Sequence, residues 1–431
     1  MIENLLNFYI PIIWGFILFN KKPIKLAIFL PAFQYLKFGV SIGFTVIYAV
    51  DFFYLFMVVY IVSRLAQNKF RLPHEIGGKL ILIYTTIFII HILIGSNDDT
   101  PRALYEYIFL FITFLFYINV ISKENWIDAI QYFIIGKLII VLYSLIYLFF
   151  PDVFPLAYQT TFGIVKTDQF LRIGLLQQAS FVFLFALIFL KGYKRVFSLS
   201  ILLFLVLISG SRTHLAICLG VGAYYFIAGL YVKKRIQLFV QSLVLVFILI
   251  IGIRYIFNNP TFQRITYRYF LLFEDPLKAG GARERYFENS WQKTKDNIIF
   301  GNKIYNNRTI GKRYTNDWVV ALTGRTHNVY LAILYAYGIV GFIPVILMVL
   351  LYLVYSAKGF RIGDRSYLLY LHIVLLASII EGFSAGVYYS YIADPLIISL
   401  IMFSKYRSLE VKQDYHFNRP LSHGVPILTN D

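Results

Sequence analysis

Four short polar motifs interrupt this otherwise apolar chain, and each of them contains an arginine or a histidine. They are centred on Arg172, Arg212, Arg283 and His327. Arginine presents a planar fork of N–H donors that binds phosphate or carboxylate oxygens in a bidentate manner. Histidine takes up and releases a proton near neutral pH, so His327 is the natural candidate for a general base. The motifs predict acid–base chemistry on an anionic substrate. The alternatives are arginines that snorkel to lipid headgroups and a histidine with a structural hydrogen bond.

The composition places these motifs in a membrane protein. Hydrophobic residues make up 59% of the 431 residues and charged residues only 14%, which leaves too little polar surface to face water on all sides. Apolar runs such as 236–257 and 327–355 are long enough for a helix to cross the hydrocarbon core, which takes about 20 residues. We therefore predict an all-α fold, a polytopic transmembrane bundle of about 12–13 helices with one large extracytoplasmic loop. The expected helices lie near residues 5–19, 24–38, 43–62, 80–95, 103–121, 127–150, 173–190, 196–209, 213–232, 236–257, 327–356, 367–382 and 387–403.

The basic residues predict how this bundle is oriented. They cluster in alternate short loops, which the positive-inside rule assigns to the cytoplasm. These clusters include Lys21 and Lys22, Lys191 to Arg195, Lys233 to Arg235, and Lys358 to Arg365. The net charge of +18 follows from this pattern, so no nucleic acid is expected as a partner. We divide the chain into N-terminal transmembrane helices (1–257), a large extracytoplasmic loop (258–326), C-terminal transmembrane helices (327–404) and a cytoplasmic tail (405–431).

The loop at 258–326 is unusually long and basic. It holds twelve lysines and arginines against six acidic residues, which suits an anionic ligand such as a lipid phosphate or diphosphate. A solvated cap is the alternative interpretation. Within the loop, residues 284–296 place Phe287 and Trp291 on one face, which predicts an amphipathic helix lying on the membrane.

Ionisable residues also occur inside the apolar runs. Asp51, Glu381 and Asp394 are carboxylates at such positions, where a functional role is the default hypothesis. We favour pairing with an arginine of a neighbouring helix over a proton path. The single cysteine, Cys218, and the lack of metal-spaced ligands or a glycine-rich phosphate loop predict that no metal or other cofactor is needed.

The order of the motifs resembles the O-antigen polymerase and O-antigen ligase superfamily of bacterial envelope glycosyltransferases (the Wzy and WaaL type). The resemblance covers about residues 170–345. It rests on Arg172 with Gly174; on Ser211, Arg212 and Thr213; on Arg283 followed by Phe287, Phe300 and Gly301; and on His327 and Asn328 followed by Gly338 and Gly341. Gln177 and Gln178 replace the family's usual Pro-Asn, and Arg285 competes with Arg283 for the same role.

The resemblance implies a GT-C-like membrane glycosyltransferase at the outer face of the bacterial inner membrane, with an undecaprenyl-diphosphate-linked oligosaccharide as donor. In such an enzyme, Arg172, Arg212 and Arg283 would neutralise the leaving diphosphate. His327 would orient or deprotonate the attacking sugar hydroxyl, and Asn328 would hold that hydroxyl or the adjacent loop. Tyr286, Trp291 and Tyr330 would stack on sugar faces, with membrane anchoring as the alternative. The lipid bilayer is a partner, and a chain-length regulator and a flippase are candidate protein partners.

Two activities share this donor site. A polymerase moves the growing O-antigen, capsule or exopolysaccharide chain onto the next lipid-linked repeat unit, whereas a ligase moves the finished chain to lipid A core. We favour the polymerase, because departures from the family motifs suit enzymes whose sugar substrates vary between strains. Polymerases are also the more numerous members of the superfamily. A lipid-linked oligosaccharide transporter and a non-catalytic assembly protein are the other hypotheses. The sequence shows no inverted repeat of the kind found in many transporters, which argues against the transporter hypothesis.

Overall fold

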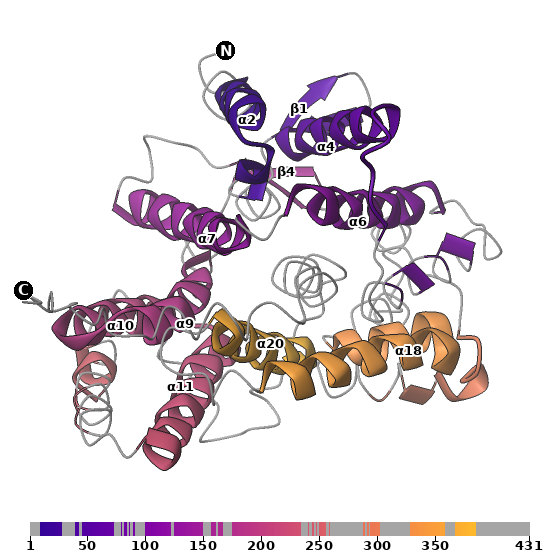
Figure 1. Cartoon of the computed structure of the whole chain (residues 1–431). Helices are drawn as coiled ribbons and strands as arrows, with labels where there is room; N and C mark the ends of the chain where they lie inside the picture. The colour runs from indigo at the N-terminus through magenta and orange to yellow at the C-terminus, as the bar shows by residue number, and fades with distance from the viewer. Residues whose placement is uncertain are drawn as a thin grey trace, which may run out of the picture.

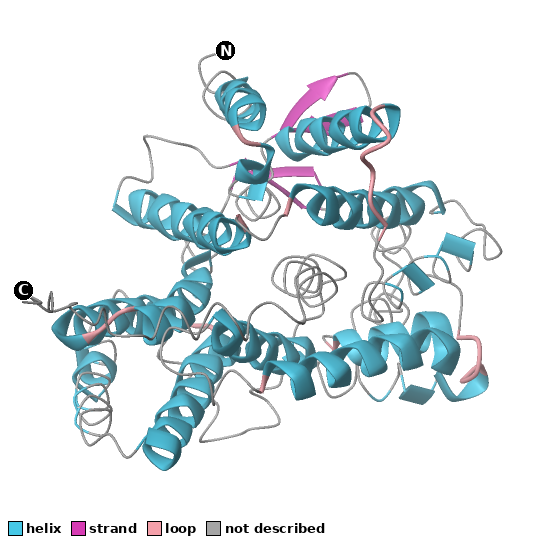
Figure 2. Ribbon diagram, viewed as in Figure 1, coloured by secondary structure: helices cyan, strands magenta, loops and turns pink. Residues whose placement is uncertain are grey.

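The computed structural model describes residues 9–27, 39–42, 45–72, 100–121, 125–149, 157–160, 163–166, 175–233, 328–357 and 367–384, with short stretches between 79 and 90, 240 and 258, and 288 and 301. The described part of the chain is mainly helical (Figures 1 and 2). Its α-helices are α2 (Ile10–Lys21), α4 (Ala49–Ala66), α6 (Thr100–Val120), α7 (Trp126–Phe149), α9 (Ala179–Phe189), α10 (Gly192–Ile208), α11 (Arg212–Lys233), α18 (Val329–Ser356) and α20 (Tyr367–Ser384). Two 3-10 turns accompany them, η2 (Pro23–Lys25) and η3 (Leu175–Gln178).

Each of these α-helices overlaps a helix that the apolar runs predict, which confirms the helical character of the fold. Two short antiparallel hairpins were not predicted (Figure 2). One pairs β1 (Gly39–Ile42) with β2 (Thr45–Tyr48), and the other pairs β3 (Ala157–Thr160) with β4 (Gly163–Lys166). The helix expected from residue 43 begins only at Ala49, because the residues before it form the first hairpin. β-Branched residues such as Val46 and Ile47 also favour extended backbone. The predicted helix at 387–403 lies outside the described residues.

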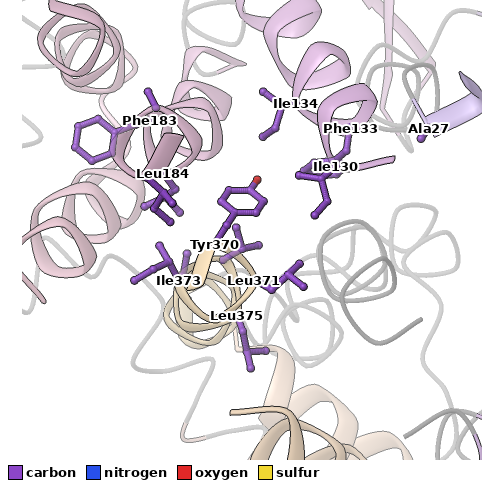
Figure 3. Close-up of a cluster of buried hydrophobic side chains, with 14 of the residues drawn as sticks. Ala27, Ile130, Phe133, Ile134, Phe183, Leu184, Tyr370, Leu371, Ile373 and Leu375 are labelled. Atoms are coloured by element: carbon purple, nitrogen blue, oxygen red, sulfur yellow. The ribbon is translucent and has the colours of Figure 1, made fainter. Parts of the chain in front are cut away.

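Helix α20 packs against α18, α11 and α9, whereas α4 packs against α2 and α6. Figure 3 shows the ring of Tyr370 on α20 directed between Ile134 and Phe133 of α7 and Phe183 and Leu184 of α9. Interdigitated side chains of this kind join helices that are distant in sequence, and their close packing excludes voids.

Polar and apolar side chains are distributed as in a protein whose solvent is lipid. Among the described residues, Lys137, Ser180, His214, His372 and Glu381 are buried. Large apolar side chains instead cover the outside of the helices. Examples are Ile13, Trp14 and Phe16 on α2, and Ile343, Leu347, Leu350 and Val354 on α18. A monomeric protein in water rarely exposes such continuous apolar surface.

Two helical segments in the described part are long and apolar enough to cross a bilayer, Asp128–Ile146 in α7 and Tyr337–Ser356 in α18. Their lengths agree with the span of about 20 residues that a hydrocarbon core requires. The fold is therefore compatible with the membrane protein that the composition predicts.

Candidate functional site at one end of the helix bundle

Buried polar contacts show that α20 runs antiparallel to both α11 and α18. His214 in the first turn of α11 contacts Glu381 near the end of α20, whereas Tyr224, further along α11, contacts His372 near the start of α20. Tyr330 at the start of α18 likewise contacts Ile379, and Ser356 at the end of α18 contacts His372. The beginnings of α11 and α18 and the end of α20 therefore lie together. The beginning of α9 joins them through Ser180. We call this end of the bundle the site end.

The centre of the site end is a buried chain of polar side chains, the Ser180–His214–Glu381 chain. The Nδ1 atom of His214 lies 2.7 Å from the hydroxyl of Ser180, and its Nε2 atom lies 3.3 Å from Oε1 of Glu381. All three residues are at most 3% exposed. The chain therefore ties α11 to both α9 and α20 through side chains rather than through apolar packing alone.

A buried lysine lies close to this chain. Lys137 on α7 is 1% exposed, and its Nζ atom is 5.1 Å from the centre of the Phe181 ring and 5.2 Å from that of Phe133. The Phe181 ring meets the His214 ring edge-on. Aromatic faces stabilise a buried ammonium group through their quadrupole. Phe181 therefore contacts both Lys137 and His214 of the Ser180–His214–Glu381 chain.

The first turn of α18 is anchored beside Glu381. The Asn328 side chain caps this helix, since its Oδ1 atom accepts a hydrogen bond from the backbone N–H of Leu331 at 2.9 Å. The hydroxyl of Tyr330 donates to the backbone carbonyl of Ile379 at 3.3 Å. Gly382 leaves room for the Tyr330 ring, because a Cβ atom there would lie only 3.0–3.1 Å from it. Residues on both sides of Glu381 therefore hold the start of α18.

A valine at Gly382 is expected to push the Tyr330 ring away and to separate the first turn of α18 from α20. Overpacking of this kind costs about 1–3 kcal/mol, so the apparent Tm of the purified protein in detergent should fall. Gly220 on α11 is the matched control, because a Cβ atom added there would have no other atom within 4 Å and Gly220→Val should leave the packing intact. Equal Tm values for the two variants would contradict the described contact between Tyr330 and Gly382.

The glycine elements at residues 301 and 338 meet in the structure. α18 is interrupted at Gly338, where φ is 62° and ψ is −166°. The freed backbone N–H groups of Ile339 and Val340 donate to the carbonyls of Ile298 and Ile299 at 2.9 and 3.2 Å. We call this connection the 298–340 latch. It attaches part of the 258–326 loop to the helix that begins beside His327 in sequence.

A family comparison covers much of this region. Residues 197–346 match the model of a family described as O-antigen ligase. The resemblance to the O-antigen polymerase and ligase superfamily is confirmed. The matched segment runs from α10 to the middle of α18 and includes Arg212, Asn328 and Gly338. It supports an O-antigen ligase or polymerase type of function for the chain, in line with the membrane character of this superfamily. No curated protein matches the chain.

Several of the predicted site residues lie at the site end. Arg212 is the first residue of α11, two positions before His214, and its side chain is partly buried. Asn328 and Tyr330 are at the start of α18. The roles that the superfamily resemblance implies for these residues stay predictions.

The amphipathic helix of the loop is described in part. Glu288, Trp291, Gln292, Thr294, Lys295 and Asp296 are helical, which agrees with the helix predicted over 284–296. The Trp291 side chain is exposed, and the Nζ atom of Lys295 lies 5.8 Å from the centre of its ring. Ile299 and Phe300, which follow, are also exposed. This exposed apolar side is what a helix lying against lipid requires.

Five of the predicted site residues lie outside the described residues: Arg172, Arg283, Arg285, Tyr286 and His327. Asp394 does so as well. Asp51 is in the first turn of α4, and Glu381 lies next to a histidine of α11.

Sequence reasoning missed Ser180, His214 and Lys137. Lys137 and His214 each carried a signal, since both are ionisable residues within apolar runs. Ser180 carried none, because serine occurs in many transmembrane helices without a special role.

Proposed function

We propose that this chain is an integral-membrane polysaccharide polymerase. It transfers the undecaprenyl-diphosphate-linked glycan chain onto the next lipid-linked repeat unit at the outer face of the bacterial inner membrane. The observation that carries the proposal is the site end, where Arg212 and a buried polar chain gather in a bundle with an apolar exterior. The family match over residues 197–346 supports the reaction class, since it includes Arg212 and the start of α18.

The chemistry of the transfer agrees with the groups at this end. When the acceptor hydroxyl attacks the anomeric carbon, a new C–O bond forms and the bond to the lipid diphosphate breaks, so negative charge grows on the leaving group. The Arg212 guanidinium would stabilise that charge by donating bidentate hydrogen bonds to the diphosphate oxygens. The N-terminal ends of α9, α11 and α18, which lie at the same end, favour negative charge as well. Arg172 and Arg283 are the further arginines in this proposal, and His327 is the base that takes the hydroxyl proton.

One ion pair between distant parts of the chain is consistent with the proposed topology. Lys22, which follows α2, forms an ion pair with Asp128 in the first turn of α7. Lys21 and Lys22 assign the first of these loops to the cytoplasm, and the predicted alternation of the helices assigns the loop before Asp128 to the same side. A contact between them is consistent with a multi-pass chain of about 12–13 helices whose site end faces outward.

The glycan ladder of a strain that lacks the gene tests the proposal. Loss of every chain beyond one repeat unit, with that unit still attached to its acceptor, is the expected result. Reintroduction of the intact gene should restore the ladder. An unchanged ladder would overturn the proposed function.

A ligase is the second candidate, because the matched family is described as O-antigen ligase. In that case full-length chains would accumulate on the polyprenyl carrier, and none would be found on lipid A core. The same gel therefore separates the two activities.

A further inference from the structure

We propose that His214 is a positioning residue for Arg212, and that the Ser180–His214–Glu381 chain fixes the start of α11 so that the arginine is held ready for the lipid diphosphate. This inference rests on the proposed function. It assigns a role to Ser180 and His214, which the sequence analysis did not single out, and to Glu381, which it did.

The first support is that both ring nitrogens of His214 are engaged by other helices. Nδ1 lies 2.7 Å from the Ser180 hydroxyl of α9, and Nε2 lies 3.3 Å from the Glu381 carboxylate of α20. A neutral ring with its proton on Nε2, toward the carboxylate, would accept the hydrogen bond from the Ser180 hydroxyl at Nδ1. A ring held on both sides cannot rotate without breaking one of these contacts. The first turn of α11 is therefore fixed relative to two neighbours.

The second support is the short connection between His214 and Arg212. The two residues lie in the same helical turn, and the turn that precedes α11 is itself braced. The Ser209 hydroxyl donates to the carbonyl of Val206 at 2.6 Å and accepts from the backbone N–H of Ser211 at 3.2 Å. Arg212 thus begins its helix between a braced turn and an anchored histidine. Donors that are already in position when charge develops stabilise a transition state most effectively.

The third support is energetic. Ionisable side chains inside a transmembrane bundle are expensive, at about 2.5–3.5 kcal/mol for an unpaired charge in lipid. Well-packed apolar residues often stabilise a protein as much as a buried ion pair does, or more. Stability alone therefore does not explain the presence of the Ser180–His214–Glu381 chain. A role in positioning Arg212 explains why polar residues occupy these buried positions.

A second buried histidine in the same bundle provides the matched control. His372 on α20 is 2% exposed and lies 2.9 Å from the Ser356 hydroxyl of α18 and 3.3 Å from the Tyr224 hydroxyl of α11. His372 also connects helices, but the residue that it contacts on α11 is Tyr224, far along the helix from Arg212. His372→Ala should lower the apparent Tm as a structural substitution does, and it should leave ligand affinity unchanged.

The test is the affinity of the full-length purified protein, in lipid nanodiscs, for undecaprenyl diphosphate. His214→Ala is expected to weaken binding by about 10–10²-fold, because a displaced Arg212 would lose hydrogen bonds to the charged diphosphate. His214→Gln, which keeps an N–H donor for Glu381, should restore part of the affinity. In the Arg212→Ala background, His214→Ala should have no further effect, because coupled residues are not additive. If His214→Ala does not fold, Glu381→Gln provides the same measurement with the carbonyl oxygen retained.

The outcomes separate the two proposals. The positioning role alone would be overturned if the wild type binds and His214→Ala binds with the same affinity. Additive losses of affinity in the variant that carries both Arg212→Ala and His214→Ala would overturn it too. Equal losses in His214→Ala and His372→Ala would also overturn it, because they would indicate a general structural effect. No binding by the wild type would overturn the proposed function, and the positioning role with it.

Discussion

Replacement of Arg212 by alanine is expected to lower the rate of glycan transfer by about 10²–10³-fold, the usual effect of removing one donor that stabilises developing negative charge. Arg212 is the first residue of α11, at the end of the bundle where α9 and α18 also begin. Its loss removes the positive charge and the bidentate fork from this position. The rate at which chains longer than one repeat unit appear after induction of the gene in the deletion strain measures the effect.

Arg212→Lys separates charge from geometry. Lysine keeps the positive charge but lacks the planar fork, so the rate should fall between those of the wild type and Arg212→Ala. Arg254 provides the control, because it is an exposed helical arginine in the described part of the chain. Arg254→Ala should change the rate by less than about threefold, since surface substitutions away from special features usually change free energies by less than about 0.5 kcal/mol. A normal ladder in Arg212→Ala, at a normal protein level in the membrane fraction, would remove Arg212 from the mechanism.

Gly338→Ala is expected to cause the largest loss of stability. The backbone conformation of Gly338 is nearly exclusive to glycine and costs other residues about 1–3 kcal/mol. A Cβ atom there would also lie 2.2 Å from the carbonyl oxygen of Ile299, so the 298–340 latch has to open. Opening it breaks two backbone hydrogen bonds of about 0.5–1.5 kcal/mol each. The expected total is about 2–6 kcal/mol, measured as a fall in apparent Tm in detergent.

The same substitution should impair transfer. The latch sets the direction of the part of α18 between Asn328 and Gly338, and this part begins beside the proposed base His327. Gly220→Ala is the control, because that helical position is open and alanine favours helix. Its Tm should stay the same or rise slightly. A Gly338→Ala protein with the Tm and glycan ladder of the wild type would show that the latch has no role in folding or transfer.

The positions of the helices could be predicted because a run of about 20 apolar residues satisfies the length of a bilayer core by itself. The apolar run at 327–356 became α18, and the run at 213–232 became α11. The hairpin at 39–48 was missed, because an apolar run rich in β-branched residues is compatible with both helix and strand. Local preference alone does not choose between them.

The motifs did not predict the contacts that the structure shows around them. Gly338 stood out as part of a Gly-Xaa-Xaa-Gly element, yet the reason for glycine is the carbonyl oxygen of Ile299, from the loop before α18. Glu381 stood out as a carboxylate in an apolar run, yet its partner turned out to be His214 on α11. Both answers depend on residues that are distant in the chain.

The sequence by itself predicted the helical fold and the resemblance to the O-antigen polymerase and ligase superfamily, which the family match over residues 197–346 supports. Hydropathy and motif order are properties of local segments and can be read without a fold. Only the tertiary structure decided that Ser180, His214 and Glu381 meet beside Arg212. Such a meeting depends on which helix faces pack together and on the antiparallel direction of α20 against α11. Those choices depend on contacts between segments that are distant in the sequence, and no single segment contains that information.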